Sequence, residues 1–110
     1  MEWWLMTLKQ HQDWLVDFYK RRDWYKYSSF IRLNFLTEEV GELSRAIRAI
    51  EIGRDHPGEH ETREKRNENL HEELADVMDQ VLILCDKYQV DPDSLMAFSE
   101  AKLKKRFNEQ

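Results

Sequence analysis

The residues best suited to chemistry in this chain are acidic, and they occur twice in the same pattern. Residues 36–47 read Leu-Thr-Glu-Glu-Val-Gly-Glu-Leu-Ser-Arg-Ala-Ile, and residues 70–81 read Leu-His-Glu-Glu-Leu-Ala-Asp-Val-Met-Asp-Gln-Val. Both segments carry apolar residues at the alternating three- and four-residue spacing of an amphipathic helix. Relative to these apolar stripes, Glu39 and Glu42 occupy the positions that Glu73 and Asp76 occupy in the second segment.

Carboxylates at this spacing point to a divalent cation. A step of three residues at about 1.5 Å each places two carboxylates about 4.5 Å apart along one side of a helix. Two such helices packed through their apolar stripes would bring four carboxylates together. One like-charged pair about 4 Å apart costs roughly 4 kcal/mol at an effective dielectric constant of about 20. The acids therefore either stay partly protonated and solvated, as on an ordinary acidic helix face, or bind a cation. Oxygen ligands without paired histidine or cysteine favour Mg²⁺, with Mn²⁺ as a substitute.

The composition bounds the class of protein. A chain of 110 residues is expected to form a single domain over residues 1–110. The net charge of −5 argues against a nucleic-acid surface, which needs a positive field. The lone cysteine, Cys85, lies in an apolar run and is expected to be buried. Because no apolar stretch of transmembrane length and no signal-peptide pattern occurs, no membrane association is expected and the cytoplasm is the predicted location.

The elements that must position the acids are all helical. The spacing predicts helices over residues 3–22, 29–52, about 59–88 and about 92–107, and no strand-like alternation stands out. Gly53 is a predicted C-cap, and Asp91-Pro92 predicts a helix start with Asp as the N-cap. Pro57 and Gly58 indicate a loop, which argues against a zinc site at His56 and His60. We expect an all-α, four-helix-type bundle in which the second and third helices are antiparallel and their acids face each other.

Large aromatic side chains are numerous for so small a body. Four Trp, four Tyr and five Phe occur in the chain, with the tryptophans at Trp3, Trp4, Trp14 and Trp24. A domain of this size cannot readily cover them all. The simplest solution is an apolar surface shared with a partner, which predicts a homo-oligomer.

The acidic pattern also resembles a known family. Glu38-Glu39-x-x-Glu42 followed by Glu73-x-x-Asp76 is similar to the EExxE…ExxD signature of the MazG-like nucleoside triphosphate pyrophosphohydrolases, an all-α group related to the all-α dUTPases and dCTPases. The similarity covers roughly residues 10–107, including a basic tail at residues 102–107 and an Arg-Asp-Trp sequence at residues 22–24. The chain departs from the family in a longer connection between the two acidic motifs and in Glu100, where related tails often carry Asn.

This resemblance implies Mg²⁺-dependent hydrolysis of nucleoside triphosphates to a monophosphate and pyrophosphate by a homodimer or homotetramer, as in nucleotide pool sanitation. It implies that the four motif acids bind the metal and that Glu38 steers the attacking water. Lys102 and Arg106 would bind the phosphates, although alone they are typical of a solvated C-terminal turn. Trp24 is a candidate for stacking on the base, with a core or interface role as the alternative.

Two other functions are consistent with an acidic helical chain. A di-iron carboxylate bundle needs two Glu-x-x-His motifs that face inward. The chain carries Glu68-x-x-His71, which is out of phase with its stripe. A metal- or nucleotide-binding regulatory module without turnover would retain the acids, and an activity assay with Mg²⁺ would separate it from the hydrolase.

Overall fold

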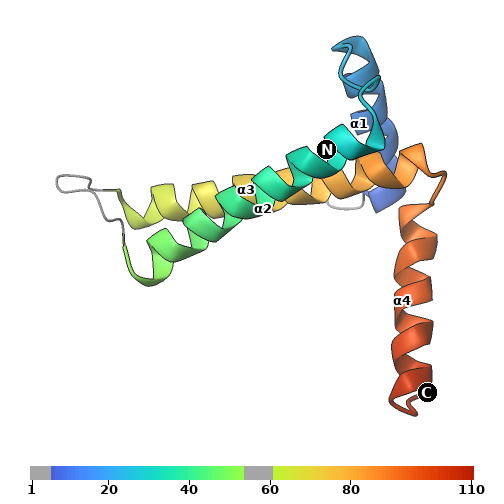
Figure 1. Ribbon diagram of the computed structural model, residues 1–110. Helices are drawn as coiled ribbons and strands as arrows, with labels where there is room; N and C mark the ends of the chain where they lie inside the picture. Colours follow the sequence, from blue (N-terminus) through green and yellow to red (C-terminus); the bar gives the residue numbers. More distant parts are fainter. Residues whose placement is uncertain (1–5, 54–60) are drawn as a thin grey trace. The chain divides into compact units, whose positions relative to one another are not determined.

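The computed structural model describes residues 6–53 and 61–110, and these residues form four α-helices and no strand (Figure 1). The prediction of an all-α chain is therefore confirmed. None of the helices in this described part combines the length and the apolar character that a membrane span requires. The helices are α1 (Leu8–Arg21), α2 (Ser29–Glu51), α3 (Arg63–Lys87) and α4 (Pro92–Arg106).

The first helix begins later than predicted. Thr7 is its N-cap: the Thr7 hydroxyl accepts from the Gln10 backbone N–H at 3.1 Å, and the Gln10 side chain accepts from the Thr7 backbone N–H at 2.8 Å. This reciprocal pair is a capping box, which fixes the helix start at Leu8. The expected start at residue 3, with Trp3 and Trp4, lies outside the described residues.

The other helix ends follow local signals. Ser28 caps α2. Asp91 caps α4 with Pro92 in the first turn, and this helix start was predicted. Gly53 follows the end of α2 with φ +86°, a left-handed conformation that glycine adopts without strain. The third helix begins at Arg63 rather than near residue 59, and the Pro57-Gly58 loop and both of its histidines lie outside the described residues.

The chain divides into two compact units. One consists of Met1–Tyr27 and Leu82–Gln110, and we call it the α1/α4 unit; the other, Ser28–Val81, is the hairpin unit. The α1/α4 unit contains an apolar core in which α1 packs against the last turns of α3. That core consists of Leu15, Val16, Tyr19, Leu82 and Ile83.

Polar groups inside the α1/α4 unit are paired. The fully buried Gln12 donates from its side-chain amide to the Leu82 backbone oxygen at 3.0 Å. The Tyr25 hydroxyl donates to Asp86, and burial together with this carboxylate raises the pKa of Tyr25 to about 12. Cys85 is buried, as predicted, and burial raises the pKa of its thiol. This unit is therefore held by apolar packing with satisfied hydrogen bonds.

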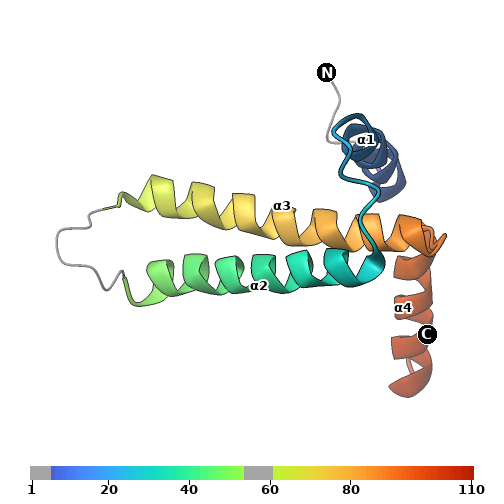
Figure 2. The same cartoon turned by 45° about the horizontal axis from the view of Figure 1, so that its top comes forward.

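The hairpin unit consists of α2 and the larger part of α3, which run side by side in opposite directions (Figures 1 and 2). This confirms the predicted antiparallel arrangement of the two acidic helices. Its buried residues, within the described part, are Ala49 and the charged Arg32, whose guanidinium donates to the Gln80 side-chain oxygen at 3.3 Å. The unit thus buries little apolar surface of its own.

The two apolar stripes are only partly covered within the chain. Val40 and Ile47 of α2 are 49% and 44% exposed, and Leu74 and Val81 of α3 are 49% and 38% exposed. A contact between two helices covers only a narrow strip of each, so a stripe broader than this strip needs a further surface to cover it.

Candidate metal centre

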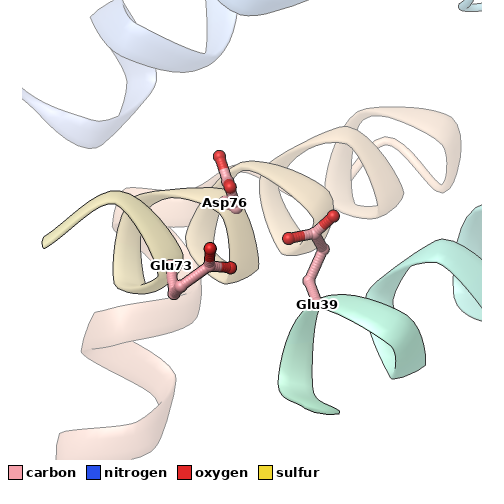
Figure 3. Close-up of side chains that lie close together, drawn as sticks. All are labelled: Glu39, Glu73 and Asp76. Carbon is pink, nitrogen blue, oxygen red and sulfur yellow. The ribbon is translucent and has the colours of Figure 1, made fainter. Parts of the chain in front are cut away.

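Three of the predicted acids lie together in the hairpin unit. Carboxylate oxygens of Glu39, Glu73 and Asp76 all lie within 4.8 Å of one another, and all three side chains are partly buried. Figure 3 shows Glu39 projecting from α2 toward Glu73 and Asp76 on α3. The antiparallel course of the two helices places the earlier acid of the α2 motif level with the later acid of the α3 motif. Glu39 therefore meets Asp76, and Glu73 lies about one turn away on the same side of α3.

The electrostatics of this acidic cluster oppose full ionisation. Burial, followed by repulsion from Asp76 and Glu73, raises the pKa of Glu39. Burial and then Asp76 raise the pKa of Glu73. For Asp76, burial, Glu72 and Asp79 raise the pKa, while a hydrogen bond with the Glu39 carboxyl opposes this rise. Each carboxyl group therefore gives up its proton less readily than an ordinary one. A bound cation would reduce this cost by stabilising the ionised carboxylates.

The donor set fits a hard divalent cation. All three residues offer oxygen, and one of these oxygens, Oε2 of Glu73, is buried without a hydrogen-bond partner among the described residues. A buried acceptor without a donor is costly unless a cation or water satisfies it. Carboxylate ligands of this kind suit Mg²⁺ and Mn²⁺.

The fourth predicted ligand is placed differently. Glu42 is not part of the close group; its Oε1 lies 3.3 Å from the Arg45 guanidinium, on the same helix. Glu38 and Glu72, which precede Glu39 and Glu73 in the two motifs, are exposed. The structure thus brings together three of the four predicted ligands, whereas the fourth, Glu42, forms an ion pair with Arg45.

A polar cavity adjoins the acidic cluster, and sequence reasoning did not identify it. Its volume is about 160 Å³, and it lies between α2 and α3 with Glu73 shared between cavity and cluster. One signal was available: Arg66 precedes Glu73 by seven residues, or about two helical turns, and therefore lies on the same face. The lining residues are Glu42, Arg45, Ala46, Ala49, Glu61, Arg66, Asn69 and Glu73.

The remaining predicted site residues belong to the α1/α4 unit. Lys102 and Arg106 are exposed on α4. Trp24 is 42% exposed and meets the rings of Phe18 and Tyr19 edge-on, with centroids 5.8 and 5.5 Å away. Packing contacts and an exposed ring face coexist at Trp24, and the roles of all three residues stay predictions.

Comparison with known proteins agrees with the geometry. Residues 31–109 match the model of the MazG nucleotide pyrophosphohydrolase domain, and this range contains the whole acidic cluster. The chain is also 46% identical over 103 residues to the uncharacterized protein YvdC of Bacillus subtilis (strain 168), with 93% of this chain and 97% of that protein covered. With most of its length matched and its paired acids in place, the chain belongs to the MazG nucleotide pyrophosphohydrolase domain family.

Proposed function

We propose that this protein, as a single domain over residues 1–110, hydrolyses nucleoside triphosphates to a nucleoside monophosphate and pyrophosphate with Mg²⁺. The observation that carries the proposal is the convergence of Glu39, Glu73 and Asp76 from two helices, in a chain of the pyrophosphohydrolase family. Burial, and then repulsion from neighbouring carboxylates, raises the pKa of Glu39 and of Glu73, so ionising the cluster is costly unless it has a cation to bind.

The acids of the hairpin unit would hold the metal. Glu39, Glu73 and Asp76 supply the close ligands, and Glu42 joins them once it exchanges its Arg45 partner for the cation. When bound, Mg²⁺ or Mn²⁺ supplies positive charge that polarises phosphoryl oxygens. The exposed Glu38, adjacent to Glu39 in sequence, would orient the attacking water and accept its proton.

Residues of the α1/α4 unit would hold the rest of the substrate. Lys102 and Arg106 are four residues apart on α4, so both project from one side of this helix, as two ligands of one phosphate chain must. The exposed part of the Trp24 ring offers a stacking surface for the base.

A homo-oligomer, either a dimer or a tetramer, would cover the apolar face of the hairpin unit. This face comprises the exposed stripe residues Val40, Ile47, Leu74 and Val81, together with Met78, which is 40% exposed. Sedimentation analysis of wild type and of Leu74→Glu tests this assembly. We expect wild type to be oligomeric and the variant to dissociate; a monomeric wild type would contradict the proposal.

The reaction is tested by product identification. The protein is incubated with Mg²⁺ and each standard nucleoside triphosphate, and the products are followed by phosphorus NMR. We expect monophosphate and pyrophosphate as the first products, from attack at the α-phosphorus. Orthophosphate and a diphosphate would contradict the position of cleavage. Metal and nucleotide binding without any turnover would favour a regulatory module instead.

A further inference from the structure

The polar cavity between α2 and α3 holds two guanidinium groups that the proposed reaction has not used. Arg45 and Arg66 line it together with Asn69, and its acids are Glu42, Glu61 and Glu73. At about 160 Å³ it is smaller than the roughly 300–1,000 Å³ of pockets that enclose drug-sized ligands. Its size therefore suits phosphate groups rather than a whole nucleoside.

Arg66 has a buried donor with nothing to bind. Its Nε is buried and has no hydrogen-bond partner among the described residues, although Glu61 and Glu73 line the same cavity. The Nε–H group is thus shielded from water and has no protein acceptor to replace the lost hydrogen bond, which is energetically unfavourable. A planar guanidinium binds phosphate oxygens through two parallel N–H groups, which an ammonium group cannot do.

The charge of the cavity makes anion binding depend on the metal. Three carboxylates and two guanidiniums line it, a balance of −1. One divalent cation on Glu73 changes this balance to +1 and makes the cavity attractive to an anion. The Arg45 guanidinium is also easily redirected, because its ion pair with Glu42 has side chains 68% and 51% exposed, and exposed pairs of this kind are weak.

We propose that this cavity binds the terminal phosphates of the substrate, and that Arg66, assisted by Arg45 and Asn69, grips the diphosphate portion that leaves as pyrophosphate. This assignment rests on the proposed function. It adds an orientation for the substrate, because the terminal phosphate of the triphosphate would lie toward Arg66 and the α-phosphate nearer the metal ligand Glu73. In this arrangement Arg66 is a binding residue for the leaving group.

Calorimetric titration of pyrophosphate into the full-length chain tests this site without turnover. Titrations are made with saturating Mg²⁺ and with EDTA, for wild type, Arg66→Gln and Arg66→Lys. The matched control is Arg63→Gln, which removes the same charge one turn away on α3 from an exposed residue outside the cavity lining. Orthophosphate and a nucleoside monophosphate serve as ligands without a diphosphate group.

We expect pyrophosphate to bind wild type only with Mg²⁺, and its Kd to rise roughly ten- to a hundredfold in Arg66→Gln, the range typical of losing a charge-assisted hydrogen bond. Arg63→Gln should change the Kd less than twofold. Binding of the monophosphate and of Mg²⁺ alone should be retained in Arg66→Gln. Arg66→Lys, which keeps the charge and the fold, should still weaken pyrophosphate binding, because it lacks the forked donor.

The assignment would be overturned if wild type did not bind pyrophosphate, or bound it equally well without Mg²⁺. It would also be overturned if Arg63→Gln weakened pyrophosphate binding as much as Arg66→Gln does. Affinity within twofold of wild type in Arg66→Lys and Arg66→Gln would do the same. Failure of the proposed function gives a different result: a protein that binds pyrophosphate through Arg66 but cleaves no nucleotide would retain the cavity site and contradict only the hydrolase.

Discussion

The α1/α4 unit and the hairpin unit bury different kinds of side chain. The first encloses Leu82 and Ile83 in an apolar cluster, and the buried polar Gln12 has a hydrogen-bond partner there. The second partly buries three mutually repelling acids and leaves much of its apolar surface exposed. One helix, α3, contributes to both units, with Leu82 as its first residue in the α1/α4 unit.

The two ends of α3 therefore differ in role: its last turns contribute to the apolar core, and its earlier part carries the acids of the candidate metal centre. Apolar burial supplies most of the favourable free energy of folding, so the α1/α4 unit contributes stability with little help from ligands. The hairpin unit instead holds groups that are unfavourable in isolation and become favourable when a cation and a covering surface are present. Such a region is a candidate for function because its cost is otherwise unexplained.

The largest expected effect is on activity. Glu39→Gln and Glu73→Gln should each lower kcat/KM about a thousandfold, or about 4 kcal/mol of transition-state stabilisation, because each removes a close metal ligand. Circular dichroism should show an unchanged fold. Glu72→Gln, a matched change at an exposed position beside Glu73, should behave like wild type. Equal losses in all three variants would mean that the acidic cluster is misassigned.

The second prediction compares one substitution in the two units. Leu82 is 3% exposed and Leu74 is 49% exposed, and both lie on α3. Leu82→Ala should lower the free energy of unfolding by about 2–5 kcal/mol, because it leaves a cavity in the core. Leu74→Ala should cost less than about 1 kcal/mol. Urea unfolding of metal-free protein at low concentration measures both, and equal costs would contradict the contrast between the units.

The third prediction concerns phosphate binding from the α1/α4 unit. Lys102→Ala and Arg106→Ala should each lower kcat/KM roughly ten- to a hundredfold, because charge-assisted hydrogen bonds are worth about 1.5–3 kcal/mol. Lys104→Ala is the control, since Lys104 projects from a different side of the same helix. Changes below twofold in both variants would assign Lys102 and Arg106 to the solvated end of α4.

The smallest expected effect is on stability and depends on pH. Because the pKa of Glu39 is raised in the folded protein, the folded state binds its proton more tightly than the unfolded state. The free energy of unfolding therefore falls as pH rises from the ordinary carboxyl value of about 4.3 through the raised value. Without metal at pH 7, Glu39→Gln should be more stable than wild type by roughly 0.5–1 kcal/mol, given about 0.2–0.5 kcal/mol for each like-charged neighbour.

The gain in Glu39→Gln should shrink toward zero as the pH falls below the ordinary carboxyl value, where wild type is protonated as well. Urea unfolding at several pH values with EDTA present measures this trend. A gain that is the same at pH 4 and pH 7 would show that charge repulsion is not its cause.

The sequence predicts the helical elements well because their signals are local. Asp91-Pro92 and Gly53 mark helix ends through backbone chemistry that does not depend on tertiary contacts. The capping box of Thr7 and Gln10 was also present in the sequence, and its use would have corrected the start of α1. The meeting of Glu39 with Glu73 and Asp76 was predictable because both helices repeat one phase.

Properties that depend on which surface covers a helix were not predictable. The exposure of Val40 and Leu74 is set by the width of the contact between two helices and not by their position in a stripe. The pairing of Glu42 with Arg45 depends on the rotamers of two long side chains. The burial of Arg66 Nε likewise requires the neighbouring helix, although the spacing from Glu73 indicates its face.

The most direct test of the central claim is metal binding by the hairpin acids, measured by calorimetry and by thermal melts with Mg²⁺ against EDTA. We expect Mg²⁺ to bind wild type and, at about 100 times its Kd, to add about 2.7 kcal/mol to the free energy of unfolding. For a domain of this size the corresponding rise in Tm is roughly 10 °C. Glu73→Gln should lose most of the binding heat and of the Tm rise, while Glu72→Gln retains both. No binding heat and an unchanged Tm in wild type would show that Glu39, Glu73 and Asp76 form only an acidic helix surface.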